Sequence, residues 1–312
     1  MTDRKVRVTA KTDRPVWLTL LAFAIIYFVW GSTFLAIRIG VHEVPPLIFA
    51  GLRFLPAGAV LTAWMMLRGE RLPTARQWGS GCLLALLMFV VDYGLLFWAE
   101  QRVPSGVAAV MMATIPAFIA LAEIVLLRTR RLTLRLGIAL LVGIAGVAVL
   151  VSHSVSLGAA ALDWRGALAL LVGALAWSVA SVLSRRLPLP ESRGMSSGTQ
   201  MLLGGAMLML TAAAFGEFRS FHPAAVSRGA WVALAYLVVA GSIIGFTAYV
   251  WLLSHESPTK VGTYAYVNPV VAVVLGYFLG GETLGLRTVV GTVCVLVSVV
   301  LITTTPAKKA AP

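Results

Sequence analysis

Two charged side chains lie within otherwise apolar stretches of this 312-residue chain. Arg53 belongs to the stretch 46–67 and Asp92 to the stretch 77–99. At a rise of 1.5 Å per residue, both lie roughly 10 Å from the same end of their stretches. Charges at such depth in an apolar environment are costly and are usually paired or functional. The sequence therefore predicts an Arg53–Asp92 ion pair, either functional or structural, with Arg53 snorkelling outward on its own as the alternative.

Two tryptophans, Trp30 and Trp177, lie near the middle of apolar stretches, whereas the other seven lie near the ends. End positions are typical of tryptophans at the headgroup level of a membrane. Small hydroxyl side chains follow both central residues, among them Ser32 and Ser181. This placement predicts that Trp30 and Trp177 bind an apolar or aromatic group. Helix packing or lipid contact is the alternative.

Further candidates for such a site are polar, aromatic or helix-interrupting residues at middle depth. The candidates for binding are Tyr93, Phe97, Tyr264, Asn268 and Ser181. Pro116 and Pro269 are predicted to break the hydrogen-bond ladders of their helices and to act in gating, since proline lacks a backbone donor. This set predicts a polar, aromatic cavity, and ordinary hydrogen bonding between helices remains the alternative.

Patterns for enzymatic chemistry are missing from the sequence. It contains no phosphate-binding loop, no zinc-binding histidine pair and no nucleophile elbow. Cys82 and Cys294 lie inside apolar stretches without the spacing of a metal or redox motif, and they are interpreted as packing residues. We therefore expect no enzyme activity, no cofactor and no metal site.

The positioning elements are membrane-spanning helices. The chain is 59% hydrophobic and 12% charged, against about 25% charged residues in an ordinary soluble domain. Since roughly 20 apolar residues span a bilayer as a helix, we predict ten spans. They cover residues 17–39, 46–67, 77–99, 103–127, 133–151, 164–187, 196–216, 229–253, 258–280 and 286–304.

The second five spans repeat the first five. An offset of 147 aligns Trp30 with Trp177 and Arg38 with Arg185, and an offset of 153 aligns Pro116 with Pro269. A unit with an odd number of spans ends on the opposite side of the membrane, so its copy is inverted. The predicted organisation is a tail (1–16), a first repeat (17–151), a linker (152–163), a second, inverted repeat (164–304) and a tail (305–312).

The net charge is +13, and the basic residues are distributed unequally between the two sides of the predicted topology. Eighteen of the 25 basic residues lie in the tails and in the loops on the same side as the tails, and six lie on the other side. This bias is the positive-inside pattern, which predicts that both termini are cytoplasmic. No nucleic-acid partner is expected.

Three segments carry a resemblance to a known family: FVWGSTFLAIRIG at 28–40, LRFLPAG at 52–58 and YVNPVVAVVLGYFLGGETL at 266–284. The chain resembles EamA-type members of the drug/metabolite transporter superfamily, and in particular bacterial aromatic amino-acid and metabolite exporters. The resemblance implies an all-α polytopic membrane protein with ten helices around a central cavity. It places Trp30, Trp177, Asn268 and Pro269 at or near that cavity. The Gly281-Glu282 pair has no counterpart in the first half.

These observations predict an exporter of small metabolites in a bacterial inner membrane, acting by alternating access on amino acids, including aromatic ones. A multidrug or cationic-compound exporter and a non-transport membrane protein are the alternatives. The expected partners are a small-molecule substrate and the lipid bilayer, with the chain a monomer or a weak homo-oligomer. No chain of carboxylates or histidines indicates a coupling ion, so facilitated exit and antiport both remain open.

Overall fold

The computed structural model describes residues 16–127, 132–151, 163–256 and 261–304, and within these ranges the chain forms helices and no strands. The predicted all-α class is therefore confirmed for the described residues. The helices of the first half are α1 (Val16–Ala24), η1 (Ile25–Val29), α2 (Trp30–Val41), α3 (Pro46–Leu67), α4 (Ala75–Ala85), η2 (Leu86–Tyr93), α5 (Gly94–Glu100), α6 (Ser105–Met112), α7 (Ile115–Ala122), η3 (Glu123–Leu127) and α8 (Leu134–Val151).

The helices of the second half follow after the segment 152–162. They are α9 (Trp164–Leu183), α10 (Arg193–Ala214), η5 (Glu217–Arg219), η6 (Pro223–Ala225), α11 (Arg228–Tyr236), η7 (Leu237–Ile244), α12 (Gly245–His255), α14 (Tyr264–Phe278) and α15 (Leu286–Thr303). The predicted tails and the predicted linker lie almost entirely outside the described residues, as do Arg128, Arg130, Arg131 and Lys260.

Seven helical stretches in the described part of the chain are long and apolar enough to cross a membrane. They are Val16–Val41, Pro46–Leu67, Ala75–Glu100, Ser105–Leu126, Trp164–Leu183, Arg228–Leu252 and Leu286–Thr303. The helices at Leu134–Leu150 and Tyr264–Phe278 are apolar but shorter. Helix α10 has 22 residues and is the most polar of the long helices, since its first turns carry Ser196, Thr199 and Gln200.

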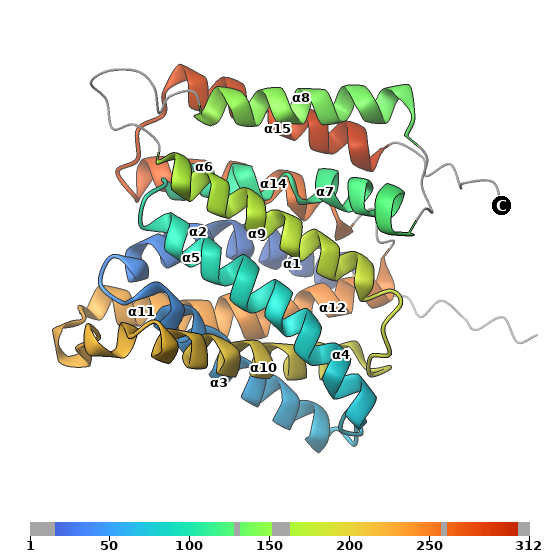
Figure 1. Cartoon of the computed structure of the whole chain (residues 1–312), viewed down its shortest axis with the longest axis vertical. Helices are drawn as coiled ribbons and strands as arrows, with labels where there is room; N and C mark the ends of the chain where they lie inside the picture. Colours follow the sequence, from blue (N-terminus) through green and yellow to red (C-terminus); the bar gives the residue numbers. More distant parts are fainter. Residues whose placement is uncertain (1–15, 128–131, 152–162, 257–260, 305–312) are drawn as a thin grey trace, which may run out of the picture.

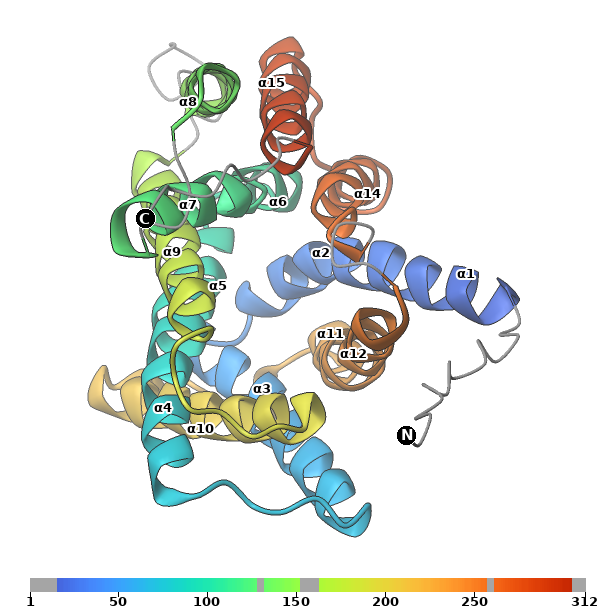
Figure 2. The same ribbon diagram turned by 90° about the vertical axis from the view of Figure 1, so that its right-hand side faces the viewer.

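The helices lie side by side, and their order in space differs from their order in sequence (Figures 1 and 2). Helices α8 and α15 pack together at one edge of the molecule, and α3 and α10 pack together near the opposite edge. Between them, α2 packs on α14 and α11, while α9 packs on α7, α5 and η2. Each half of the chain therefore makes its main contacts with the other half.

Four of the spans contain a π-helical segment, namely η1, η2, η3 and η7. A π-helical turn inserts an additional residue into the helix, so it rotates the side chains that follow and loosens the local backbone hydrogen bonding. Segments η2 and η7 each have 8 residues, and both lie in the middle of their spans. Of the candidate residues, Asp92 and Tyr93 lie in η2, and Trp30 directly follows η1.

Candidate functional site

Trp30 is the first residue of α2, directly after η1. Its indole Nε1 donates a hydrogen bond of 3.0 Å to the carbonyl oxygen of Gly241 in η7. Its ring lies 5.2 Å from the ring of Tyr249 and 5.1 Å from that of Tyr264, centroid to centroid. Trp30 therefore connects its span to α12 and α14 through an aromatic cluster.

Asn268 lies in α14 and is buried against the π-helical segment η1. With its amide nitrogen turned toward that segment, Asn268 donates to the main-chain oxygens of Ile26 and Tyr27, each at 3.2 Å. The same nitrogen lies 3.2 Å from the carbonyl oxygen of Tyr264. Gly31 allows this close approach of the helices, because a Cβ at that position would lie 2.6 Å from Cβ of Val271. Asn268 thus links α14 to two main-chain carbonyls of the π-helical segment η1.

Trp177 lies in α9 and contacts the ring of Tyr93 edge-on, with 6.0 Å between centroids. The hydroxyl of Ser181, one turn later, donates to the carbonyl oxygen of Trp177 at 2.8 Å and is satisfied within its own helix. Phe97 is fully buried and packs on Phe49 at 5.8 Å between centroids. In this conformation Phe97 is a packing residue, whereas Trp177 and Tyr93 are partly buried.

The predicted ion pair between Arg53 and Asp92 is not formed. Among the described residues, no carboxylate oxygen lies within 4.0 Å of the Arg53 guanidinium. Arg53 Nε instead donates to the hydroxyl of Ser242 at 3.1 Å, and the guanidinium carbon lies 4.6 Å from the ring centroid of Phe54 and 5.4 Å from that of Tyr93.

Asp92 points toward α9, where a Cβ on Gly173 would lie 3.0 Å from Asp92 Oδ1. That oxygen has no hydrogen-bond partner among the described residues. The physical reason for the failed prediction is helix phase. Tyr93 faces Arg53, and the preceding residue of a helix projects roughly 90° away from it. Equal depth in neighbouring spans therefore does not bring two side chains together.

The two candidate prolines differ in their effect. The span that contains Pro116 is interrupted at residues 113 and 114, and α7 begins at Ile115, directly before the proline. The carbonyl oxygen of Ile115 accepts a hydrogen bond from Ser178 of α9 at 3.1 Å. Helix α14 continues through Pro269, which lacks the backbone N–H of the hydrogen-bond ladder but does not end the helix.

Four of the candidate residues form a row through the interior, which we call the central row: Trp30, Arg53, Tyr93 and Trp177. Gly241 and Ser242 of η7 connect its first two members, since one accepts from Trp30 and the other from Arg53. The ring of Tyr93 then bridges Arg53 and Trp177. The row joins α2, α3, η2, η7 and α9, and thus both halves of the chain.

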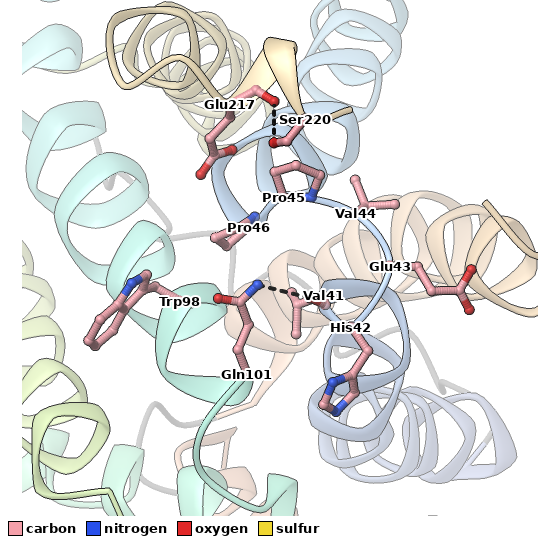
Figure 3. Close-up of a pocket in the computed structure, with 10 residues that line it drawn as sticks. All are labelled: Val41, His42, Glu43, Val44, Pro45, Pro46, Trp98, Gln101, Glu217 and Ser220. Atoms are coloured by element: carbon pink, nitrogen blue, oxygen red, sulfur yellow. Dashed lines mark hydrogen bonds between the residues drawn. The ribbon is translucent and has the colours of Figure 1, made fainter. Parts of the chain in front are cut away.

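A separate cavity of about 450 Å³ lies at the end of the bundle that the charge bias assigns to the outside. The loop 41–46, Trp98, Gln101, Glu217 and Ser220 line it (Figure 3). Gln101 donates to the carbonyl oxygen of Val41 at 3.0 Å. Burial, with the nearby Arg38 charge second, lowers the pKa of His42, which favours its neutral form.

Two carboxylates cap the N-termini of helices near this cavity. Glu217 accepts from the backbone nitrogens of Leu47 and Ile48 at the start of α3, and burial raises its pKa. Glu43 accepts from the nitrogen and the hydroxyl of Ser227, which precedes α11, and these bonds lower its pKa. Carboxylates are favourable at helix N-termini, where backbone N–H groups are unpaired.

Sequence reasoning missed Tyr249, Gly241, Ser242 and Glu282. The first three carry no signal that separates them from other residues of an apolar span. Glu282 belongs to the Gly281-Glu282 pair in the segment that carries the family resemblance. That pair was a sequence signal from which a structural role of Glu282 could have been predicted.

The described residues form only helices, and seven helical stretches among them are apolar and long enough to cross a membrane, which is typical of an integral membrane protein. The EamA-like transporter family matches residues 17–152 and again residues 164–304. The chain belongs to this family, as its sequence motifs predict.

Individual relatives agree with this assignment. The chain is 43% identical over 262 residues to the uncharacterized inner membrane transporter YedA of Escherichia coli (strain K12), covering 83% of this chain and 82% of YedA. It is 25% identical over 297 residues to the uncharacterized transporter YoaV of Bacillus subtilis (strain 168), covering 93% and 98%. A solved crystal structure that is 24% identical matches with a TM-score of 0.60 over 92% of this chain and 96% of the other, a likeness of fold.

Proposed function

We propose that this membrane transporter exports small, partly apolar metabolites, most of all amino acids including aromatic ones, by alternating access. In this proposal ten membrane helices form two inverted five-helix repeats around a central cavity, and the central row is the binding site. The row carries the proposal, because it places tryptophan and tyrosine rings from both halves beside a buried cation. Flat rings bind apolar and aromatic side chains well, and polar groups fix orientation.

The pairing of helices supports two equivalent repeats. If the halves are exchanged, α3 takes the place of α10 and α8 that of α15, and both of these pairs pack together. The contact of α2 with α14 then corresponds to that of α9 with α7, and the contact of α3 with η7 to that of α10 with η2. The double family match supports the same division. Inverted repeats allow two alternate gates around one site.

Orientation is part of the proposal: both termini are cytoplasmic, as the positive-inside bias suggests. In a variant without Cys82 and Cys294, single cysteines would be introduced in the N-terminal tail and, as a control, beside the outer cavity at Ser220. We expect an impermeant thiol reagent to label the second in intact cells and the first only after lysis. Labelling of the tail in intact cells would contradict this orientation.

Substrate flux tests the proposed function. Purified protein would be reconstituted into vesicles loaded with a panel of labelled amino acids. Efflux would be compared with that from protein-free vesicles loaded in the same way. We expect saturable, protein-dependent efflux that is fastest for aromatic or large apolar side chains. Absence of flux for the whole panel, with folded protein in the vesicles, would refute amino-acid export.

Export of cationic compounds is the second candidate, because Asp92 is a buried carboxylate without a partner for one oxygen. An unpaired carboxylate in the interior is the group that a cation transporter requires. The same vesicles, loaded with a lipophilic cation, distinguish the candidates. Flux of the cation that depends on Asp92, without amino-acid flux, would favour this second candidate.

A further inference from the structure

Arg53 is a buried cation whose hydrogen-bonding capacity is largely unused. Its side chain is on α3, and the residue is 3% exposed. Nε donates to Ser242, while Nη1 has no hydrogen-bond partner among the described residues. A guanidinium has five N–H donors in a fork that matches a carboxylate. The Arg53 fork is therefore incomplete in this conformation.

Leaving a buried charge unpaired is unfavourable. Its desolvation is only partly offset by the rings of Phe54 and Tyr93, because a cation–π contact is weaker than a full ionic partner. A charged group in a membrane interior normally has a partner or a function. The unpaired donors of Arg53 thus indicate an anionic partner that the chain itself does not supply in this conformation.

The surroundings of Arg53 define the kind of anion. On one side of Arg53, the ring of Tyr93 contacts Trp177. On the other side, Gly241, which precedes Ser242, accepts a hydrogen bond from Trp30. A Cβ on Gly241 would lie 3.4 Å from Arg53 Nη2 and 3.0 Å from Thr33 Cγ2, so the glycine lets η7 approach the cation closely. An anion at Arg53 would therefore have aromatic faces within reach in both directions.

We propose that Arg53 binds the carboxylate of the transported substrate, with Ser242 as a positioning residue that holds Nε. This inference rests on the proposed function only in that the site is a transport site. It extends to any small organic acid with an apolar or aromatic body. Recognition requires the charge and the two-pronged geometry of the guanidinium together.

Carboxylates of the chain itself are the competing partners for Arg53. Glu100 and Asp92 are both buried, and Glu100 has no hydrogen-bond partner for either side-chain oxygen among the described residues. If one of them were the partner in another conformation, a substrate carboxylate would add nothing to affinity. The experiment below separates these cases, because it compares ligands that differ only at the carboxylate.

Binding would be measured by calorimetry on purified protein in lipid nanodiscs, with two matched pairs of probes. The pairs are phenylalanine with phenylalaninamide, and 3-phenylpropanoate with 3-phenylpropanamide. We expect the wild-type chain to bind the acid of at least one pair about tenfold or more tightly than the amide, because hydrogen bonds to charged groups are strong. In Arg53→Gln this preference should disappear, in Arg53→Lys it should be partial, and in Ser242→Ala it should be reduced.

Arg102→Gln is the matched control. Arg102 also lies over an aromatic ring, 3.8 Å from the centroid of Trp98, but it is at the outer surface and pairs with Asp163 at 3.5 Å. It should keep the wild-type preference. Gel filtration would verify that each variant is folded. If Arg53→Gln does not fold, Arg53→Lys and Ser242→Ala carry the test.

The outcomes separate the two proposals. An acid preference that persists in Arg53→Gln and Ser242→Ala overturns the carboxylate site. A wild-type chain that binds each acid and its amide equally also overturns it. In a third outcome, the chain prefers 3-phenylpropanoate over 3-phenylpropanamide, this preference depends on Arg53, and phenylalanine does not bind. That result would support the carboxylate site and contradict amino-acid export.

Discussion

The carboxylate of Glu282, in the loop after α14, lies 3.5 Å from Nε of Arg38 in α2. Glu282 also accepts from the backbone nitrogens of Ser105 at 2.6 Å and Gly106 at 3.1 Å, at the start of α6. Gly281, with a φ of +64°, makes the turn that presents Glu282, a conformation that favours glycine. One carboxylate therefore ties three spans from both halves together.

Arg185 occupies the position in the second half that Arg38 occupies in the first, and it also pairs with a glutamate of the other half. Its Nη1 lies 2.6 Å from Oε1 of Glu123. The two pairs lie at opposite ends of the bundle if the predicted topology is right. The Arg185 side chain is 56% exposed, whereas that of Glu282 is largely buried.

We predict that Glu282→Ala destabilises the protein by about 2–3 kcal/mol, because two backbone donors and a hydroxyl lose a charged acceptor. Arg185→Gln should cost less than about 1 kcal/mol, as is usual for an exposed ion pair. Denaturant unfolding in detergent micelles measures both, with the exposed loop residue Glu70→Ala as control. Equal effects of the first two variants would contradict the assigned roles.

We predict weak coupling between Arg53 and Asp92. Asp92→Asn and Arg53→Gln should change the free energy of unfolding by amounts that add to within about 1 kcal/mol in the double variant. A direct buried pair would show coupling of about 3–5 kcal/mol, because breaking it leaves one charge uncompensated. The measurement is a double-mutant cycle in micelles. Coupling of that larger size would restore the ion pair that the structure lacks.

Trp30→Phe should lower stability by about 1–3 kcal/mol, because the buried carbonyl of Gly241 loses its donor while an aromatic ring is kept. Trp177→Phe is the matched control, as the contact of Trp177 with Tyr93 is made by the ring. Trp30→Ala and Trp177→Ala should both reduce flux of aromatic substrates per folded molecule. Normal flux in both alanine variants would remove the tryptophans from the proposed site.

Stability should depend on pH through Glu43. Its hydrogen bonds with Ser227 lower its pKa below the ordinary value of 4.5, so the folded state favours the ionised form. The resulting stabilisation is complete above the unfolded pKa and is lost as pH falls through the lower, folded value. Melting temperatures of the wild type and of Glu43→Gln should differ at pH 6 and converge near pH 3. A difference that persists at low pH would exclude the carboxylate as its source.

The apolar helices and the family are readable from the sequence because both depend on local information. A span must satisfy its backbone hydrogen bonds within itself, so hydropathy alone locates α3, α9 and α15 to within a few residues. For the predicted span 258–280, residues 258–260 lie outside the described part of the chain, and α14 covers Tyr264–Phe278.

The partners of individual side chains are decided by tertiary structure. Depth along a span follows from counting residues, but direction depends on helix phase, which the π-helical segments η1, η2 and η7 shift. The phase turns Arg53 toward Ser242 and Asp92 toward Gly173, and Asn268 of α14 meets the carbonyl oxygens of η1. Thus the sequence by itself determined the depth of these residues along their helices. Only the packing of helices from the two halves of the chain decided which of those residues meet.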